Sequence, residues 1–114
     1  MIDRKVASDP NLGAAVRASV SKEAIAAFCR RHHIRKLSLF GSVLRDDFRP
    51  DSDIDVLVEF EPGHAVGWGI IEIEEELSRL FGGGHKVDLV REKYLNPRLR
   101  DRILASAEVQ YVEG

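Results

Sequence analysis

Two short runs of alternating side chains, with a polar segment between them, constrain the fold of this chain more than any other feature. The first run is Arg-Lys-Leu-Ser-Leu-Phe at residues 35–40, and the second is Asp-Ile-Asp-Val-Leu-Val-Glu-Phe at residues 53–60. Alternation of apolar and polar side chains is typical of a strand with one buried face. The two runs therefore predict two strands of a small sheet, joined by the polar segment 41–52.

The polar segment begins with Gly41 and Ser42, a pair suited to binding phosphate. Gly41 has no Cβ, so its backbone can turn tightly and approach a phosphate closely. Ser42 offers a hydroxyl group and a backbone N–H to phosphate oxygens. We expect a short helix over about 43–47, with its N-terminal amides near the phosphates. Arg45 in that helix would either reach a phosphate or pair with a nearby carboxylate.

Asp53 and Asp55 open the second strand, on the face opposite to the apolar side chains of the run. Their Cα atoms would lie roughly 6.5 Å apart, which allows the two carboxylates to share a pair of divalent cations. A solvated turn accounts for residues 50–52 but not for this pair. A calcium-binding loop is excluded, because Val56 and Pro62 stand where that loop requires Gly and Glu. The pair therefore predicts a metal site for a nucleoside triphosphate.

A third carboxylate, Asp88, lies in a later apolar run at residues 85–90. The apolar side chains of this run would face one side of a strand and Asp88 the other. A carboxylate in such a run is costly to bury unless it is paired or binds a metal. Asp88 alone is weak evidence for a site, but as the third member of a set with Asp53 and Asp55 it becomes an expected ligand of the catalytic metal. Mg²⁺ is the expected cation, because it prefers oxygen ligands.

The run from Leu39 to Gly63 is similar to the minimal nucleotidyltransferase family, part of the DNA polymerase β-like superfamily. The family motif is Gly-Ser, ten residues and Asp-x-Asp, and residues 41–42 and 53–55 match it directly. The family has a third Asp on a later strand, which Asp88 would supply. The resemblance extends over about residues 21–112.

The resemblance implies an α/β fold in which a small mixed β-sheet has helices packed on one face, the polymerase β-like nucleotidyltransferase core. It also implies that Gly41, Ser42 and Arg45 bind the nucleotide, while the three carboxylates hold two Mg²⁺ ions. Many relatives carry Arg-Gly-Glu where this chain has Arg45-Asp46-Asp47. This difference leaves the metal-binding carboxylates intact.

Members of the family are commonly the antitoxins of HEPN–MNT toxin–antitoxin pairs. For this chain, the resemblance implies transfer of AMP from ATP to the hydroxyl group of a tyrosine in a partner HEPN toxin. We also expect a homo- or hetero-oligomer, in which the second chain completes the acceptor pocket. Two alternatives remain open. A non-catalytic antitoxin that neutralises its toxin by binding would have no need of three convergent carboxylates. A small-molecule nucleotidyltransferase usually carries an extra substrate domain, which we do not expect in a chain of this length.

Composition and charge limit the remaining possibilities. The 114 residues are 44% apolar and 32% charged, which is typical of one compact domain. The net charge of −2 disfavours an extended nucleic-acid-binding surface. No run approaches the ~18 apolar residues of a membrane span. The single cysteine, Cys29, fits a buried structural thiol and a cytoplasmic location.

The rest of the chain predicts three helices, one before the first strand, one between the second and third strands, and one near the C-terminus. The first runs from Ser21 to about His32, the second covers 66–81, and the third begins at Asn96-Pro97. We expect residues 1–20 to form an N-terminal arm, partly disordered or with a short helix at Leu12–Ala18. Residues 21–114 would form the nucleotidyltransferase domain.

Several expectations concern single side chains on these elements. The cluster Arg30-Arg31-His32-His33 would be a solvated helix end, and its adjacent histidines point apart and make a poor metal pair. We expect Trp68 to pack in the core or an interface, and residues 109–112 to form an edge strand. On the helices, we expect an inward face with Leu99, Ile103 and Leu104, and a solvated face with Glu72, Glu74, Glu75 and Glu76.

Overall fold

The computed structural model describes residues 9–64 and 69–113. In chain order, the elements are α1 (Leu12–Ala18), α2 (Lys22–Arg31), β1 (Ile34–Phe40), the 3₁₀ turn η1 (Gly41–Leu44), β2 (Ile54–Phe60), α3 (Ile70–Leu80), β3 (Val87–Arg91), the 3₁₀ turn η3 (Glu92–Tyr94), α4 (Pro97–Ser106) and β4 (Glu108–Val112). All four predicted strands and the helices before, between and after them are confirmed. Trp68 lies outside the described residues.

The four strands form one mixed sheet in the order β3-β2-β1-β4. β1 is antiparallel to both of its neighbours, while β2 and β3 are parallel because the chain crosses over between them through α3. β4 lies at one edge, as the sequence predicts for residues 109–112. In this arrangement, the start of β2 lies between the end of β1 and the start of β3.

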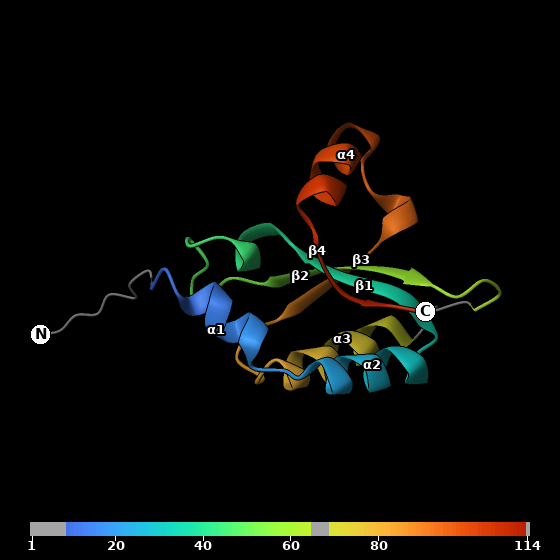
Figure 1. The fold of residues 1–114 in the computed structure, drawn as a ribbon, viewed down its shortest axis with the longest axis horizontal. Helices are drawn as coiled ribbons and strands as arrows, with labels where there is room; N and C mark the ends of the chain where they lie inside the picture. The colour runs from blue at the N-terminus through green and yellow to red at the C-terminus, as the bar shows by residue number, and fades with distance from the viewer. Residues whose placement is uncertain (1–8, 65–68, 114) are drawn as a thin grey trace, which may run out of the picture.

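Helices α2 and α3 lie side by side and cover one face of the sheet (Figure 1). Ser21 caps α2 by accepting a hydrogen bond from the Ala24 backbone N–H at 3.0 Å. The core between these helices and the sheet consists of fully or almost fully buried side chains, among them Ile25, Phe28, Leu37, Leu39, Val56, Val58 and Leu77. The predicted small mixed sheet with helices on one face is therefore confirmed.

Helix α4 stands on the other side of the sheet from α2 and α3 (Figure 1). Asn96 caps it and Pro97 occupies its first turn, as predicted. The expectation that Leu99 faces inward is wrong, because 44% of this residue is exposed. Ile103 and Leu104 are half-buried. Helical spacing of apolar residues indicates an amphipathic face, but it does not show whether this chain covers that face.

Helix α3 is tied to its neighbours through two glutamates, which the sequence pattern placed on the solvated face. Glu74 accepts a hydrogen bond from the backbone N–H of Leu89 on the edge strand β3, at 2.9 Å. Glu76 pairs with His32 at 2.8 Å and also with Arg31. The expectation that these two glutamates face solvent is therefore wrong, since each satisfies a group on another element.

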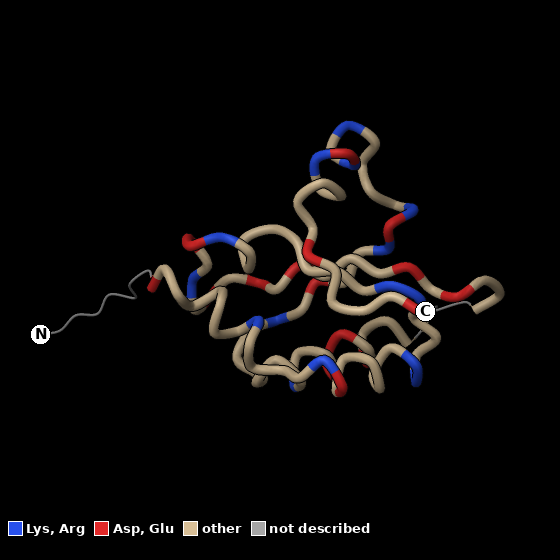
Figure 2. The backbone as a smooth tube through the Cα atoms, viewed as in Figure 1, with Lys and Arg blue, Asp and Glu red and all other residues tan. Residues whose placement is uncertain are grey.

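The charged residues are mixed by sign along the backbone in Figure 2, where Lys and Arg segments lie near Asp and Glu segments. Cys29 is buried, and this burial raises the pKa of its thiol to about 12, as suits a structural side chain. In the part of the chain that the structure describes, no helix is both long and apolar enough to cross a membrane.

Candidate active site

Gly41 brings the backbone of the turn after β1 against a carboxylate of β2. Its φ angle is +77°, in the left-handed region that side chains with a Cβ rarely adopt. A Cβ added to Gly41 would lie only 2.3 Å from Oδ2 of Asp55. The register explains this contact, because Phe40, the residue before Gly41, lies opposite Asp55 in the β1–β2 ladder. Glycine is therefore required here both by the backbone and by the carboxylate.

The three predicted carboxylates gather at the start of β2 and β3. Asp55 and Asp88 lie opposite each other in the parallel ladder, and Asp53 immediately precedes β2. The pKa of Asp55 is raised, first by burial and then by the negative charges of Asp88 and Asp53, while Arg45 lowers it. Within residues 9–64 and 69–113, no ion pair neutralises any of the three. The sheet therefore concentrates uncompensated negative charge beside the Gly41 turn.

This donor set suits a hard divalent cation such as Mg²⁺. All three side chains are carboxylates, which are oxygen donors, and a cation would offset the mutual repulsion that raises the pKa of Asp55. Their donor atoms are not drawn together as tightly as those of another cluster, described below. The residues therefore fit the predicted ion, while their metal-ligating and catalytic roles stay predictions.

The Gly-Ser turn differs in conformation from the predicted helix over 43–47. It is a single 3₁₀ turn over Gly41–Leu44, in which the Arg45 N–H donates to the Ser42 carbonyl at 2.9 Å. Arg45 is already extended, and Phe48 is fully buried. The helical expectation is wrong because the chain must leave the turn early to place Phe48 in the core.

Helix α1 supports the back of this turn. The guanidinium of Arg17 donates a hydrogen bond to the Val43 carbonyl at 2.5 Å. A Cβ added to Gly13 would lie 2.5 Å from the same carbonyl oxygen and 3.1 Å from that of Arg45. Only a glycine allows this close approach. Sequence reasoning found the short helix at Leu12–Ala18 but missed these contacts, for which a glycine between apolar helical residues was the one signal.

Comparison with known proteins identifies the family of the chain. A family model described as a nucleotidyltransferase domain matches residues 21–109, most of the chain. The chain belongs to the nucleotidyltransferase family. It is therefore an enzyme of that family, and the minimal nucleotidyltransferase resemblance is confirmed. Protein adenylyltransferase MntA of Thermococcus cleftensis is 38% identical over 82 residues, which cover 72% of this chain and 78% of the relative.

Solved structures show the same fold. One described as a candidate minimal nucleotidyltransferase is similar with a TM-score of 0.66 at 38% identity, and the match covers 83% of this chain and 92% of that one. Another holds a tri-AMPylated Shewanella oneidensis HEPN toxin in complex with an MNT antitoxin, with a TM-score of 0.57 at 18% identity over 85% of this chain and 72% of the other. The second likeness concerns the fold alone.

Arg45 of this nucleotidyltransferase pairs with a neighbour in its own loop. Its Nε lies 3.1 Å from Oδ1 of Asp47, and both side chains are more than half exposed. An exposed pair of this kind is weak. Of the two roles expected from the sequence, the structure shows the carboxylate pairing. Contact with a phosphate stays a prediction, and the weak pair leaves Arg45 free to exchange partners.

The loop from Arg45 to Asp53 is anchored so that it holds the start of β2 beside β3. Nδ1 of His85 lies 2.9 Å from the Ser52 carbonyl, and its ring packs against Phe48 with 4.8 Å between centroids. Ile54 N–H donates to the Lys86 carbonyl at 2.8 Å. These contacts position Asp53 and Asp88 relative to each other.

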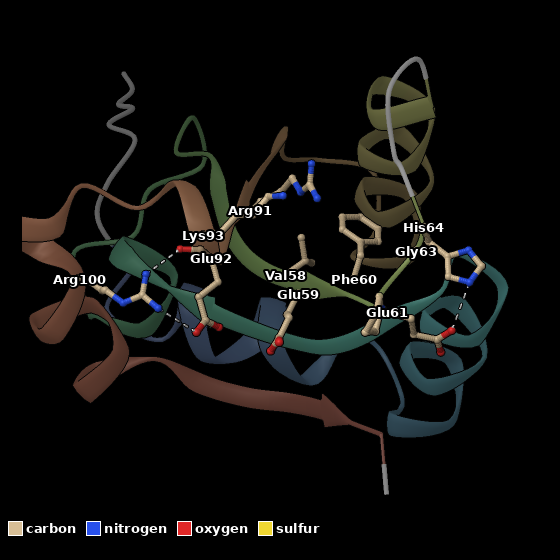
Figure 3. A pocket seen from close by; sticks show the side chains of 11 residues that line it. Val58, Glu59, Phe60, Glu61, Gly63, His64, Arg91, Glu92, Lys93 and Arg100 are labelled. Carbon is tan, nitrogen blue, oxygen red and sulfur yellow. Dashed lines mark hydrogen bonds and ion pairs between the residues drawn. The ribbon is translucent and has the colours of Figure 1, made fainter.

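A groove of about 610 Å³ lies further along β2, near its C-terminal end (Figure 3). Its lining includes three basic side chains, those of Arg91, Lys93 and Arg100. Arg100 donates to the Glu92 carbonyl at 3.3 Å and lies 3.7 Å from the Glu92 carboxylate. The groove is therefore lined by both positively and negatively charged side chains.

Proposed function

We propose that this chain transfers AMP from ATP to a tyrosine hydroxyl of a partner HEPN toxin and thereby acts as an antitoxin. The observation that carries the proposal is the convergence of Asp53, Asp55 and Asp88 beside the backbone of Gly41. Carboxylates gathered next to a phosphate-binding turn are the parts that nucleotidyl transfer requires.

Each residue of the site would have a separate task. Gly41 and Ser42 would present backbone N–H groups and a hydroxyl to the triphosphate. Asp53 and Asp55 would bind two Mg²⁺ ions, with Asp88 as the further ligand on the acceptor side. Mg²⁺, when bound, offsets phosphate charge and helps to orient the reacting oxygens.

The chemistry is an in-line displacement at the α-phosphate of ATP. The acceptor oxygen bonds to the α-phosphorus, the bond from that phosphorus to the bridging oxygen breaks, and pyrophosphate leaves. Asp88, which is exposed, would receive the proton of the attacking hydroxyl. AMP stays on the acceptor, and no covalent enzyme intermediate forms.

A protein acceptor is supported by exposed apolar side chains beyond the C-terminal end of β3 and by the related complexes. Tyr94 and Leu99 are 67% and 44% exposed on η3 and α4, close in sequence to residues that line the groove. Exposed apolar side chains of this kind are common in protein interfaces. A neighbour with this fold binds an AMPylated HEPN toxin, so we infer that a toxin covers this side and forms a hetero-oligomer with the chain. A reaction that uses ATP and Mg²⁺ also suits the cytoplasmic location expected from the sequence.

The main alternative is an antitoxin that works by binding alone. Such a protein gains nothing from Asp55, whose raised pKa shows that its ionised form is disfavoured in the folded state. A carboxylate held where its ionised form is disfavoured is better explained by a catalytic or metal-binding role. We therefore prefer the enzymatic antitoxin.

Neutralisation of the toxin in cells distinguishes the enzymatic antitoxin from the antitoxin that acts by binding alone. We expect co-expression of the wild-type chain to restore growth, and the double variant Asp53→Asn with Asp55→Asn to fail although it still copurifies with the toxin. Asp51→Asn is the matched control, since Asp51 lies in the same loop and pairs with exposed Arg49. Full neutralisation by the double variant would favour the binding antitoxin. A neighbouring gene that encodes no HEPN protein would favour a small-molecule acceptor.

A further inference from the structure

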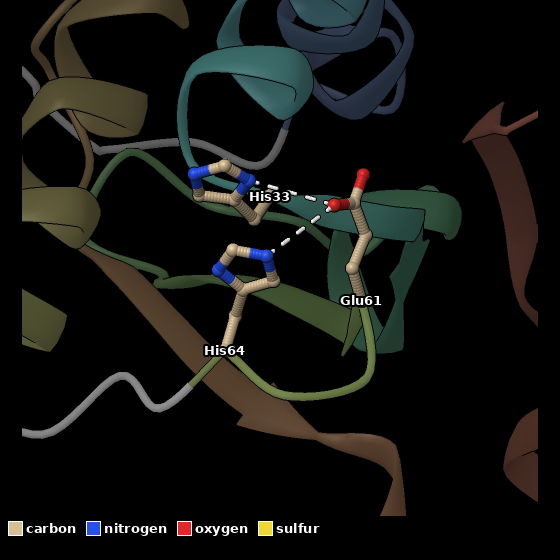
Figure 4. Close-up of side chains that lie close together, drawn as sticks. All are labelled: His33, Glu61 and His64. Carbon is tan, nitrogen blue, oxygen red and sulfur yellow. Dashed lines mark ion pairs between the residues drawn. The ribbon is translucent and has the colours of Figure 1, made fainter.

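A second cluster of ligating side chains lies at the opposite end of β2 from the carboxylates (Figure 4). It consists of His33, just before β1, and Glu61 and His64, just after β2. Glu61 is six residues from Asp55, which corresponds to roughly 20 Å along an extended strand. The cluster is therefore separate from the candidate active site.

The donor atoms of this cluster are spaced for a single ion. Nδ1 of His33 lies 3.4 Å from Oε1 of Glu61, and Nε2 of His64 lies 3.8 Å from the same oxygen. All three donor atoms lie within 4.8 Å of one another. In a tetrahedral zinc site with bonds of about 2.0–2.1 Å, neighbouring donor atoms lie roughly 3.3 Å apart. The separations of the three donor atoms are thus close to those of a single-ion site.

The backbone holds the three residues in this arrangement. His33 has a φ angle of +57°, and it is the one non-glycine residue with positive φ among those the structure describes. Its carbonyl accepts the Glu61 N–H at 2.8 Å, and the Glu61 carbonyl accepts the His64 N–H at 3.2 Å. Strained backbone of this kind persists where surrounding structure imposes it and is often found at functional sites. The antiparallel pairing of β1 and β2 thus builds the cluster from both chain segments.

The two imidazole rings are stacked, with centroids 3.8 Å apart and planes only 9° from parallel. An ion cannot lie in the planes of two rings stacked in this way, so binding requires one ring to rotate. His64 is 43% exposed at its side chain and has room to do so. Rotation of one ring would therefore bring a nitrogen of each ring toward a single ion.

The donor types select the ion. Two imidazoles and one carboxylate suit Zn²⁺ and other divalent first-row transition metals, whereas Mg²⁺ prefers oxygen ligands and water. We propose that His33, Glu61 and His64 bind one divalent transition-metal ion, such as Zn²⁺, with water in the remaining position. Glu61 and His64 also line the groove of about 610 Å³, so the ion would fix one wall of that groove.

Zinc titration of the full chain in excess Mg²⁺ tests this proposal, because Mg²⁺ competes with Zn²⁺ for the carboxylates but hardly for the imidazoles. By calorimetry, we expect one Zn²⁺ per chain and a loss of affinity of at least about tenfold in each of Glu61→Gln and His64→Gln. Visible absorption of the Co²⁺-loaded chain, which reports ligand number, should change in the same two variants. His64 and Glu61 are surface residues, and circular dichroism checks that both variants fold.

His32→Gln is the matched control. His32 is the neighbour of His33 in sequence and also pairs with a carboxylate, that of Glu76, but it has no second imidazole in its cluster. We expect this variant to bind Zn²⁺ with the affinity of the wild type. The proposal is overturned if the wild type binds no Zn²⁺, if Glu61→Gln and His64→Gln bind as well as the wild type, or if His32→Gln alone loses binding.

Discussion

Replacing Gly41 with alanine separates the two reasons for a glycine in the Gly41–Leu44 turn. The backbone reason is the φ angle of +77°. A left-handed conformation costs an alanine about 1–2 kcal/mol. The contact reason is the added Cβ, which would lie 2.3 Å from Oδ2 of Asp55. This is about 1 Å closer than the shortest ordinary contact, so the carboxylate must move by about that distance.

The backbone strain should mainly lower the stability of Gly41→Ala, and the displaced carboxylate should mainly lower its activity. The backbone strain should lower the melting temperature by roughly 4–8 °C for a domain of this size. The carboxylate is the end of a flexible side chain and can rotate away at little further cost in stability. A catalytic group displaced by 1 Å, however, costs about 100-fold in rate. We therefore expect Gly41→Ala to be a folded protein with a modestly lowered melting temperature and little AMP transfer.

Gly83→Ala is the matched control for this prediction. Gly83 also has a φ angle of +77°, but nothing lies within 4 Å of the Cβ position there. Melting curves by circular dichroism and rates of AMP transfer by mass spectrometry should show similar stability in the two variants and a rate defect in Gly41→Ala alone. Equal rates in both variants would refute the argument that Gly41 is required for its contact with Asp55.

Three further variants test other contacts. Asp55→Asn should stabilise the metal-free chain at neutral pH, since the raised pKa of Asp55 means that its ionised form is disfavoured in the fold. This gain should shrink as the pH falls toward the ordinary value of 3.8, which melting at several pH values would show. Arg17→Met removes the hydrogen bond to the Val43 carbonyl, and we expect about 1 kcal/mol less stability in chemical unfolding and slower transfer. Glu74→Ala leaves the Leu89 N–H on β3 without its partner and should cost about 1–3 kcal/mol in chemical unfolding.

Controls for these variants come from the same elements or residue types. Arg102→Met changes an exposed arginine of α4, and Glu75→Ala changes an exposed glutamate of α3. Both should match the wild type in unfolding and transfer. The reasoning fails for Asp55 if the substitution destabilises the metal-free chain at neutral pH. It fails for Arg17 or Glu74 if the variant behaves as its control does.

The sheet and the Gly-Ser to Asp-x-Asp motif were predictable because both depend on residues that are close in the sequence. Alternation fixes the faces of β1 and β2, and the spacing of Gly41 and Ser42 from Asp53 and Asp55 lies within one strand-turn-strand unit. These residues need no distant partner to show their pattern. The resemblance to a known family then indicated Asp88 as the third carboxylate.

Other features depend on contacts between distant segments and leave little trace in sequence. Gly13 and Arg17 support the Gly41–Leu44 turn only because α1 folds onto it, and Arg17 is 26 positions before Val43 in the sequence. Glu74 resembles its exposed neighbour Glu75 until the edge strand is in place. His33 stands next to His32 in the sequence, whereas Glu61 and His64 reach it only through the β1–β2 pairing.

The most direct test of the central claim is the intact mass of the HEPN protein encoded beside this gene, after incubation with the chain, ATP and Mg²⁺. We predict a gain of one or more AMP units, each about 329 Da, that is absent with the Asp53→Asn and Asp55→Asn double variant and present with Asp51→Asn. An unchanged toxin mass in a tight complex with the wild-type chain would contradict the proposed transfer.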